Sequence, residues 1–172
     1  MHAFVDHSYN RTGFTTGGSA SAVGSACVRL CEAAFAILDL HDCAGAGHPR
    51  TGLVDHIAVH AVAVPRRELG RDAYRLQAAY VARRIALTIS GESTAPIGGG
   101  GGGGEAVPPA RASGTTPVYL YGAASPVNPG LSDLRSAIGY FRGSSKDGIW
   151  EGAASEQHVE LPPPDFWVPG PQ

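Results

Sequence analysis

Residues 38–64 read LDLHDCAGAGHPRTGLVDHIAVHAVAV, and the rest of the chain is organised around this stretch. Its first half is rich in alanine and glycine and contains the triplet His48-Pro49-Arg50. Pro49 fixes its own φ and favours extended backbone at His48, which predicts a shaped loop rather than a helix. Because catalytic and binding groups tend to lie on such loops, His48 and Arg50 are the first candidates for a functional site.

The second half of the stretch, residues 55–64, alternates in the manner of a β-strand. Ile57 and Val59 fall on one face, and His56 and His60 fall on the other. Apolar residues occupy both faces near the end of the segment, which predicts a partly buried strand in the interior of a sheet.

Strand and helix patterns alternate along the rest of the chain. The expected strands are residues 2–6, 13–16 and 117–122, and the expected helices are residues 20–38, 68–89 and 131–141. Ser19 is expected to cap the first helix. This order predicts an α/β fold with a mixed β-sheet and helices packed against it.

The two long helices each show an apolar stripe at helical spacing. The first stripe is Val23, Cys27, Leu30, Ala34 and Leu38, and the second is Leu69, Ala73, Leu76, Tyr80 and Leu87. These stripes are expected to face the core. The arginines of the second helix fall mostly outside its stripe, which favours a solvated face over an anion-binding surface.

The chain length of 172 residues predicts one domain. That domain is expected over residues 1–168, with a flexible glycine-rich insert at 91–116 and an irregular proline-rich tail at 143–172. The glycines of the insert are followed by Glu105-Ala106, whereas a phosphate-binding P-loop needs a lysine and a hydroxyl there. The insert is therefore expected to act as a surface loop.

Composition argues against several classes of partner. A net charge of −2 suggests neither nucleic acid nor an anionic membrane as a partner. No apolar run approaches the roughly 20 residues that span a bilayer, and no secretory signal is visible. The 3 cysteines are an odd number, which fits reduced thiols. A cytoplasmic location is the resulting expectation.

Three kinds of site can be weighed from the residues. The imidazole of His48 could move a proton while Arg50 grips an anion, or both could simply hydrogen-bond the loop. His56 and His60 lie four apart on a predicted strand, roughly 13 Å, which is too far for one zinc ion, so no metal is expected. Cys43 has no helix N-terminus after it to lower its pKa, which disfavours a nucleophile.

Five segments occur in an order typical of a known family, namely DHSYNRTGFTT, LDLHDCAGAGHPRTGLVDHI, PVYLYGAA, LRSAIGYFR and PPDF. The chain resembles the N-terminal subdomain of the formiminotransferases, and most closely the stand-alone plant versions of that subdomain. The most specific part is the HPR-x-G-x-x-D run from His48 to Asp55, together with the downstream VYLYG strand.

The resemblance implies transfer of a formimino group from N-formiminoglutamate to tetrahydrofolate, a step of histidine degradation and one-carbon metabolism. It implies that His48 is the catalytic acid–base and that tetrahydrofolate is the co-substrate. Asn10 and Arg11 match an Asn-Arg pair of the family and are expected to line the site. Arg50 is expected to hold a substrate carboxylate.

The sequence also departs from the family pattern. Residues 44–47, Ala-Gly-Ala-Gly, stand where the family has a Lys-Gly-Glu-like stretch. The family's opening strand, first helix and second subdomain are not matched, so an exposed sheet edge and half a folate cleft are expected. Self-association could complete the cleft in a homo-oligomer. The alternative is a catalytically inactive folate-binding or regulatory module.

Overall fold

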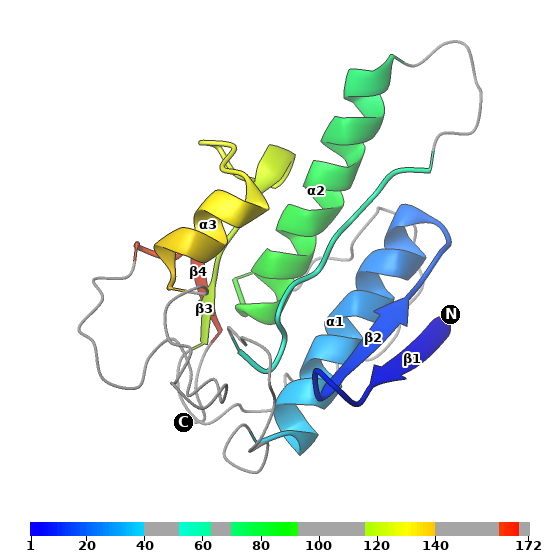
Figure 1. Ribbon diagram of the computed structural model, residues 1–172. Coiled ribbons are helices and arrows are strands. Elements are labelled where there is room, and N and C mark those ends of the chain that lie inside the picture. Colours follow the sequence, from blue (N-terminus) through cyan, green and yellow to red (C-terminus); the bar gives the residue numbers. More distant parts are fainter. Residues whose placement is uncertain (40–51, 63–69, 93–115, 140–161, 169–172) are drawn as a thin grey trace.

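The structure of the protein is a computed structural model, and it describes residues 1–39, 52–62, 70–92, 116–139 and 162–168 (Figure 1). Its described helices are α1 (Ala20–Ile37), α2 (Arg71–Ile89) and α3 (Leu131–Ala137), with a 3₁₀ helix at Gly122–Ala124. Its described strands are β1 (His2–Asp6), β2 (Arg11–Thr15), β3 (Thr116–Val118) and β4 (Phe166–Val168). The predicted α/β class is confirmed.

The described strands form two separate antiparallel pairs. β1 pairs with β2, with His2 opposite Thr15 at one end and Asp6 opposite Arg11 at the other. β3 pairs with β4, with Thr116 opposite Val168. Within the described residues the two pairs are therefore distinct small sheets and do not join into one.

The turn between β1 and β2 sets the position of Arg11. The Asp6 side chain accepts a hydrogen bond from the Tyr9 backbone N–H at 3.2 Å. Asn10 has a φ of 46°, in the left-handed region that asparagine tolerates better than most residues. The chain reverses direction at this turn, and Arg11 becomes the first residue of β2.

Helix α1 begins where the sequence predicts, because the Ser19 hydroxyl accepts a hydrogen bond from the Ala22 N–H at 3.3 Å. The predicted inward stripe is only partly correct, because Cys27 packs against the core cluster but no member of the stripe is fully buried. The buried residues of α1 are Gly24, Val28 and Cys31. Small residues occur on every side of this helix, so its sequence pattern does not identify one buried face. Packing against α2 determines which face is buried.

By length and composition alone, α1 could cross a membrane, a test that the core helix of a soluble protein also passes. In the described fold α1 packs side by side with α2 (Figure 1). The expectation that no apolar run is long enough to span a bilayer is therefore wrong for residues 20–37, which pass this test of length and composition.

Helix α2 is also rotated relative to the prediction. Its buried face includes Val81 and Ile85, 3% and 2% exposed, whereas Leu76 and Tyr80 of the predicted stripe are 66% and 53% exposed. Val81 and Ile85 form the core cluster with Val28 of α1. The core thus lies at the contact between the two long helices.

Segment 52–62 runs as a coil between α1 and α2 (Figure 1). The predicted strand is wrong for residues 55–62, because this part has no strand partner among the described residues. The predicted alternation nevertheless holds near its start. Ile57 and Val59 pack against the core, while His56 and His60 are exposed. A local pattern can orient side chains, but a strand also needs a neighbouring backbone.

In the C-terminal half, the helix expected over residues 131–141 ends at Ala137. The strand expected at residues 117–122 ends early, at Val118. Within the tail expected to be irregular, Phe166–Val168 forms β4, since β3 supplies a partner from about fifty residues earlier. Residues 93–115, which contain most of the predicted glycine-rich insert, lie outside the described residues.

Arg83 joins α2 to the 3₁₀ helix. Its side chain donates to the backbone carbonyls of Ala124 at 2.6 Å and Ala123 at 3.3 Å. At this position the prediction of a purely solvated arginine face is wrong. The reason is that carbonyls at the end of a short helix accept bonds from a guanidinium that reaches them.

Cys31 offers a test of the α1–α2 packing. Burial, with smaller contributions from Cys27 and Glu32, raises its pKa from 9.0 to about 12. This change lowers the thiolate fraction at pH 8 on the order of a thousandfold, so alkylation of Cys31 should be far slower in the folded than in the urea-unfolded chain. Because the folded pKa is the higher one, the neutral thiol favours folding below about pH 9, and this contribution is lost as the pH rises toward 12. Mass spectrometry after timed iodoacetamide treatment measures this, and equal rates would contradict the described packing.

Candidate functional site

A cluster of charged side chains forms around the carboxylate of Asp55. One oxygen of Asp55 lies 3.2 Å from a guanidinium nitrogen of Arg11 and 3.1 Å from one of Arg135. Arg11 comes from β2, Asp55 from segment 52–62 and Arg135 from α3. Three parts of the chain that are distant in sequence therefore meet at one carboxylate.

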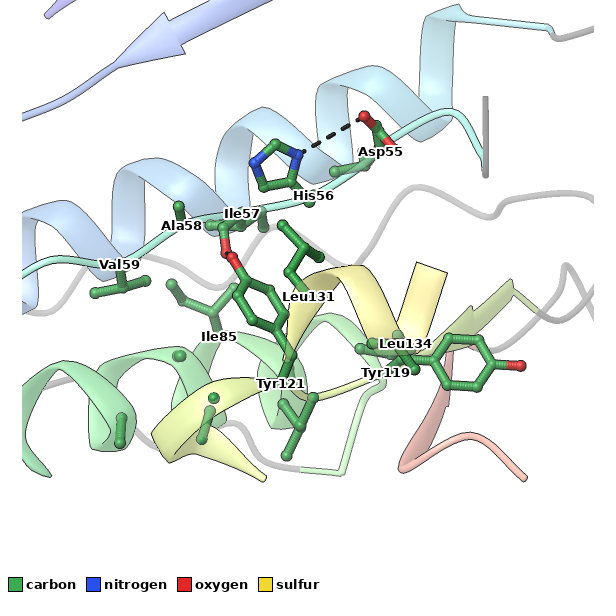
Figure 2. Close-up of a pocket in the computed structure, with 18 of the residues that line it drawn as sticks. Asp55, His56, Ile57, Ala58, Val59, Ile85, Tyr119, Tyr121, Leu131 and Leu134 are labelled. Carbon is green, nitrogen blue, oxygen red and sulfur yellow. Dashed lines mark hydrogen bonds and ion pairs between the residues drawn. The ribbon is translucent and has the colours of Figure 1, made fainter. Parts of the chain in front are cut away.

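His56 extends the same cluster. Its Nδ1 lies 3.7 Å from the Asp55 oxygen (Figure 2). The same nitrogen lies 3.3 Å from a guanidinium nitrogen of Arg135. The guanidinium of Arg11 also stands over the Tyr9 ring, 5.9 Å from its centre, a distance suited to a cation–π contact. Among the described residues, the cluster therefore gathers two guanidinium groups and one imidazole around one carboxylate.

A cavity of about 690 Å³ lies beside this cluster, and Asp55, His56 and Arg135 are part of its wall. The rest of the wall is mostly apolar and comes from segment 52–61, one face of α2, residues 116–124 and the start of α3. Its size falls in the range of small-molecule sites, roughly 300–1,000 Å³.

Two tyrosines border the cavity (Figure 2). The hydroxyl of Tyr121 donates to the backbone carbonyl of Ile57 at 3.3 Å, and that of Tyr119 donates to the carbonyl of Pro162 at 3.2 Å. Burial raises the pKa of both phenols, and Arg135 partly offsets this for Tyr121. Both groups therefore stay protonated at neutral pH and act as donors.

The predicted site residues have different outcomes. Arg11 takes part in the Asp55 cluster, whereas the neighbouring Asn10 is exposed in the turn before β2. His48 and Arg50, the leading candidates, lie outside the described residues, as does Cys43. Their predicted roles remain predictions.

The cluster contains two residues to which the sequence analysis gave no role. Asp55 closes the HPR-x-G-x-x-D run and is the one acidic residue among residues 52–62, which was an available signal. Arg135 belongs to the LRSAIGYFR segment, but it lies 80 residues from Asp55, and no local pattern indicates that the two pair. Only the packing of α3 near segment 52–62 reveals it.

The structure adds little on metal binding. Across the described residues, no group of three or more His, Cys, Asp or Glu side chains is placed to hold a metal ion. His41, Asp42 and Cys43 fall outside those residues.

Replacing Asp55 with alanine should lower the free energy of unfolding by about 2 kcal/mol. This lies between roughly 0–1 kcal/mol for exposed ion pairs and 3–5 kcal/mol for the loss of one partner of a buried pair. The Asp55 side chain is 15% exposed and those of its two arginines are 31% and 19%, which places the cluster between these limits.

Urea denaturation of the Asp55→Ala variant measures this loss. Glu92→Ala is the matched control, because Glu92 is an exposed carboxylate just beyond α2, and its loss should change the stability by less than about 0.5 kcal/mol. Equal effects of the two substitutions would show that the cluster does not hold the three segments together.

Comparison with known proteins gives two matches. Residues 1–97 match the family described as the formiminotransferase domain, N-terminal subdomain. A formiminotransferase cyclodeaminase-like protein of Arabidopsis thaliana is 27% identical over 168 residues, which cover 95% of this chain and 46% of the relative. The chain thus spans less than half of that relative's length. No solved structure matches.

Proposed function

The chain belongs to the formiminotransferase N-terminal subdomain family, and on this premise we propose that it acts as a folate-binding formimidoyl transferase. The proposed reaction moves the formimino group of N-formiminoglutamate to tetrahydrofolate and releases glutamate. His48 is the proposed general acid and base, and Arg50, Asn10 and Arg11 are the proposed substrate-binding residues.

One observation carries this proposal. Two stretches that match the family pattern, the Asn10-Arg11 pair and the run that ends at Asp55, are joined by the ion pair between Arg11 and Asp55 at 3.2 Å. They lie 44 residues apart in the chain and meet beside a cavity of about 690 Å³. This contact supports a common site for the two stretches, in a place with room for a small molecule.

The chemistry suits an imidazole. N5 of tetrahydrofolate attacks the amidine carbon of formiminoglutamate and forms a C–N bond, and N5 gives up its proton. The bond from that carbon to the glutamate nitrogen then breaks, and this nitrogen gains a proton as it leaves. A single histidine, neutral near pH 7, can accept the first proton and return it in the second step.

The charges of the described cluster suit the substrates. Formiminoglutamate and the glutamate tail of folate both carry carboxylates, and an arginine fork binds a carboxylate with two parallel hydrogen bonds. One guanidinium nitrogen of Arg11 already lies 3.2 Å from a carboxylate oxygen of Asp55. Arg50 is proposed to supply a further guanidinium.

A second candidate function is a folate-binding or regulatory module without turnover. It is favoured by residues 44–47, where Ala-Gly-Ala-Gly replaces the charged Lys-Gly-Glu-like stretch of the family. Self-association that completes the cleft would favour the transferase, whereas a monomer that binds folate without turnover would favour the module. A cytoplasmic location is part of both proposals.

The purified chain should be tested for turnover of formiminoglutamate with tetrahydrofolate, in parallel with a titration of tetrahydrofolate followed by fluorescence. Turnover supports the transferase, and binding without turnover supports the module. Absence of binding at millimolar ligand would refute both proposals.

A further inference from the structure

The imidazole of His56 lies where the charged cluster meets the cavity. It comes from segment 52–62, its side chain is 37% exposed, and it forms part of the cavity wall. Its two neighbours in the cluster, Asp55 and Arg135, both approach its Nδ1 atom. The two ring nitrogens therefore have different surroundings, and the partner of one nitrogen decides which of them carries the proton.

Arg135 determines the role of Nδ1. Its guanidinium nitrogen Nη2 lies 3.3 Å from Nδ1 of His56 and donates to an oxygen of Asp55 at 3.1 Å. A guanidinium nitrogen has hydrogens to donate and accepts none, and Nη2 carries two of them. One hydrogen can therefore go to each partner. Nδ1 is then the acceptor, and the proton of the neutral ring lies on Nε2.

The opposite tautomer fits these distances less well. A proton on Nδ1 would have to be donated to Oδ2 of Asp55, which is 3.7 Å away. That distance exceeds the roughly 2.7–3.2 Å of an N–H···O hydrogen bond. The same proton would also face the hydrogens of Arg135 Nη2, so that two donors would oppose each other. The geometry therefore favours the tautomer with its proton on Nε2.

The Nε2 atom of His56 is available to a ligand. Among the described residues, the polar contacts of this side chain are those of Nδ1. Figure 2 shows the second ring nitrogen on the side of the ring away from Asp55. A small number of fixed polar groups in a mostly apolar wall usually orients the ligand of such a cavity. The Nε2–H group of His56 is suited to this task.

The contact with Arg135 also determines which ligand group this donor prefers. A cation that donates to Nδ1 polarises the ring, because hydrogen bonds in a chain strengthen one another. The resulting Nε2–H donor binds an anionic oxygen more strongly than a neutral one. It offers no acceptor to a protonated amidine, which is itself a donor. Among the groups of the proposed substrates, a carboxylate is therefore the best match.

We propose that His56 is a substrate-binding residue whose Nε2–H donates to a carboxylate of the substrate. Arg135 is the positioning residue that fixes the tautomer of His56, and Asp55 holds Arg135 in place. The inference rests on the proposed function for the identity of the ligand. Two sources of this carboxylate follow from that function, namely N-formiminoglutamate and the glutamate tail of tetrahydrofolate.

The tautomer can be tested on the full chain without any ligand. Two-bond ¹⁵N–¹H correlation spectra at neutral pH distinguish a proton on Nε2 from one on Nδ1, and the His56 signals are assigned by their loss in His56→Asn. The Nε2–H pattern should predominate in the parent chain. In Arg135→Leu this preference should weaken, because Nδ1 loses its donor. A proton on Nδ1 or on both nitrogens of the parent chain would overturn the proposal, whatever reaction the chain catalyses.

Two substitutions of His56 separate its two nitrogens. His56→Asn keeps an acceptor near the place of Nδ1 but has no donor that reaches the place of Nε2, whereas the longer amide of His56→Gln can bring an N–H there. Calorimetry should show at least about tenfold weaker binding of the carboxylate ligand to His56→Asn, and His56→Gln should restore much of this loss. The control is His2→Asn, which changes an exposed histidine of β1 and should leave binding unchanged.

Three ligands distinguish the two sources of the carboxylate. Weaker binding of N-formiminoglutamate to His56→Asn assigns the contact to that substrate. Weaker binding of tetrahydrofolate, with no change for tetrahydropteroate, assigns it to the glutamate tail, which tetrahydropteroate lacks. Unchanged binding of all three ligands, or equal losses in His56→Asn and His56→Gln, would overturn this inference and leave the proposed function standing. Binding that depends on His56 without any turnover would refute the transferase alone, whereas no binding to the parent chain would overturn both.

Discussion

Replacing His48 with alanine is expected to lower the rate of formimino transfer by roughly 10²- to 10⁴-fold, the usual contribution of a general acid–base. The reason is that both proton movements of the reaction are assigned to this one imidazole. The loss should fall on kcat more than on KM, because the proton transfers occur in the transition state rather than in substrate binding. Steady-state turnover of formiminoglutamate with tetrahydrofolate measures both constants.

The matched control for this experiment is His2→Ala, which removes an exposed imidazole from β1. It should leave kcat and KM unchanged. Thermal unfolding of both variants should match that of the parent chain, which separates lost chemistry from lost structure. Unchanged turnover in His48→Ala would contradict the proposed role of His48, although the family membership would stand.

Replacing Ile85 with alanine is expected to lower the free energy of unfolding by about 3 kcal/mol, within the 2–5 kcal/mol typical of such a truncation in a core. Ile85 is 2% exposed and packs with Val28 and Val81 where α1 meets α2. The loss combines the transfer free energy of the removed methyl and methylene groups with the cost of the cavity that they leave. Urea denaturation followed by circular dichroism measures it.

Leu76→Ala is the matched comparison, because it shortens an aliphatic side chain on the same helix. Leu76 is 66% exposed, so its truncation should cost less than about 0.5 kcal/mol. The apolar stripe read from the sequence predicts the reverse order, with Leu76 in the core. The sign of the difference between these two variants therefore tests which face of α2 is buried.

The candidate site was only partly predictable. The Asn-Arg pair and the run ending at Asp55 are visible as motifs, and the structure joins Arg11 to Asp55. The third member, Arg135, lies on a short helix near the other end of the chain and approaches Asp55 only through the fold. A sequence pattern reports neighbours along the chain, whereas an ion pair depends on distance in space.

The sequence by itself determined the features that depend on a few consecutive residues. These are the start of α1 at its Ser19 cap and the presence of two long helices. Each rests on hydrogen bonds and backbone preferences within about one turn of chain.

Only the tertiary structure decided which helix faces are buried, that residues 55–62 have no strand partner in the described chain, and that β4 pairs with β3. Alanine-rich helices have several faces of similar hydrophobicity. The neighbouring helix therefore determines which of these faces is buried. Strand pairing likewise needs a second backbone, which comes from a distant part of the chain. Local backbone preferences determine where helices and strands form. Contacts between distant parts of the chain determine how these helices are oriented and which strands pair.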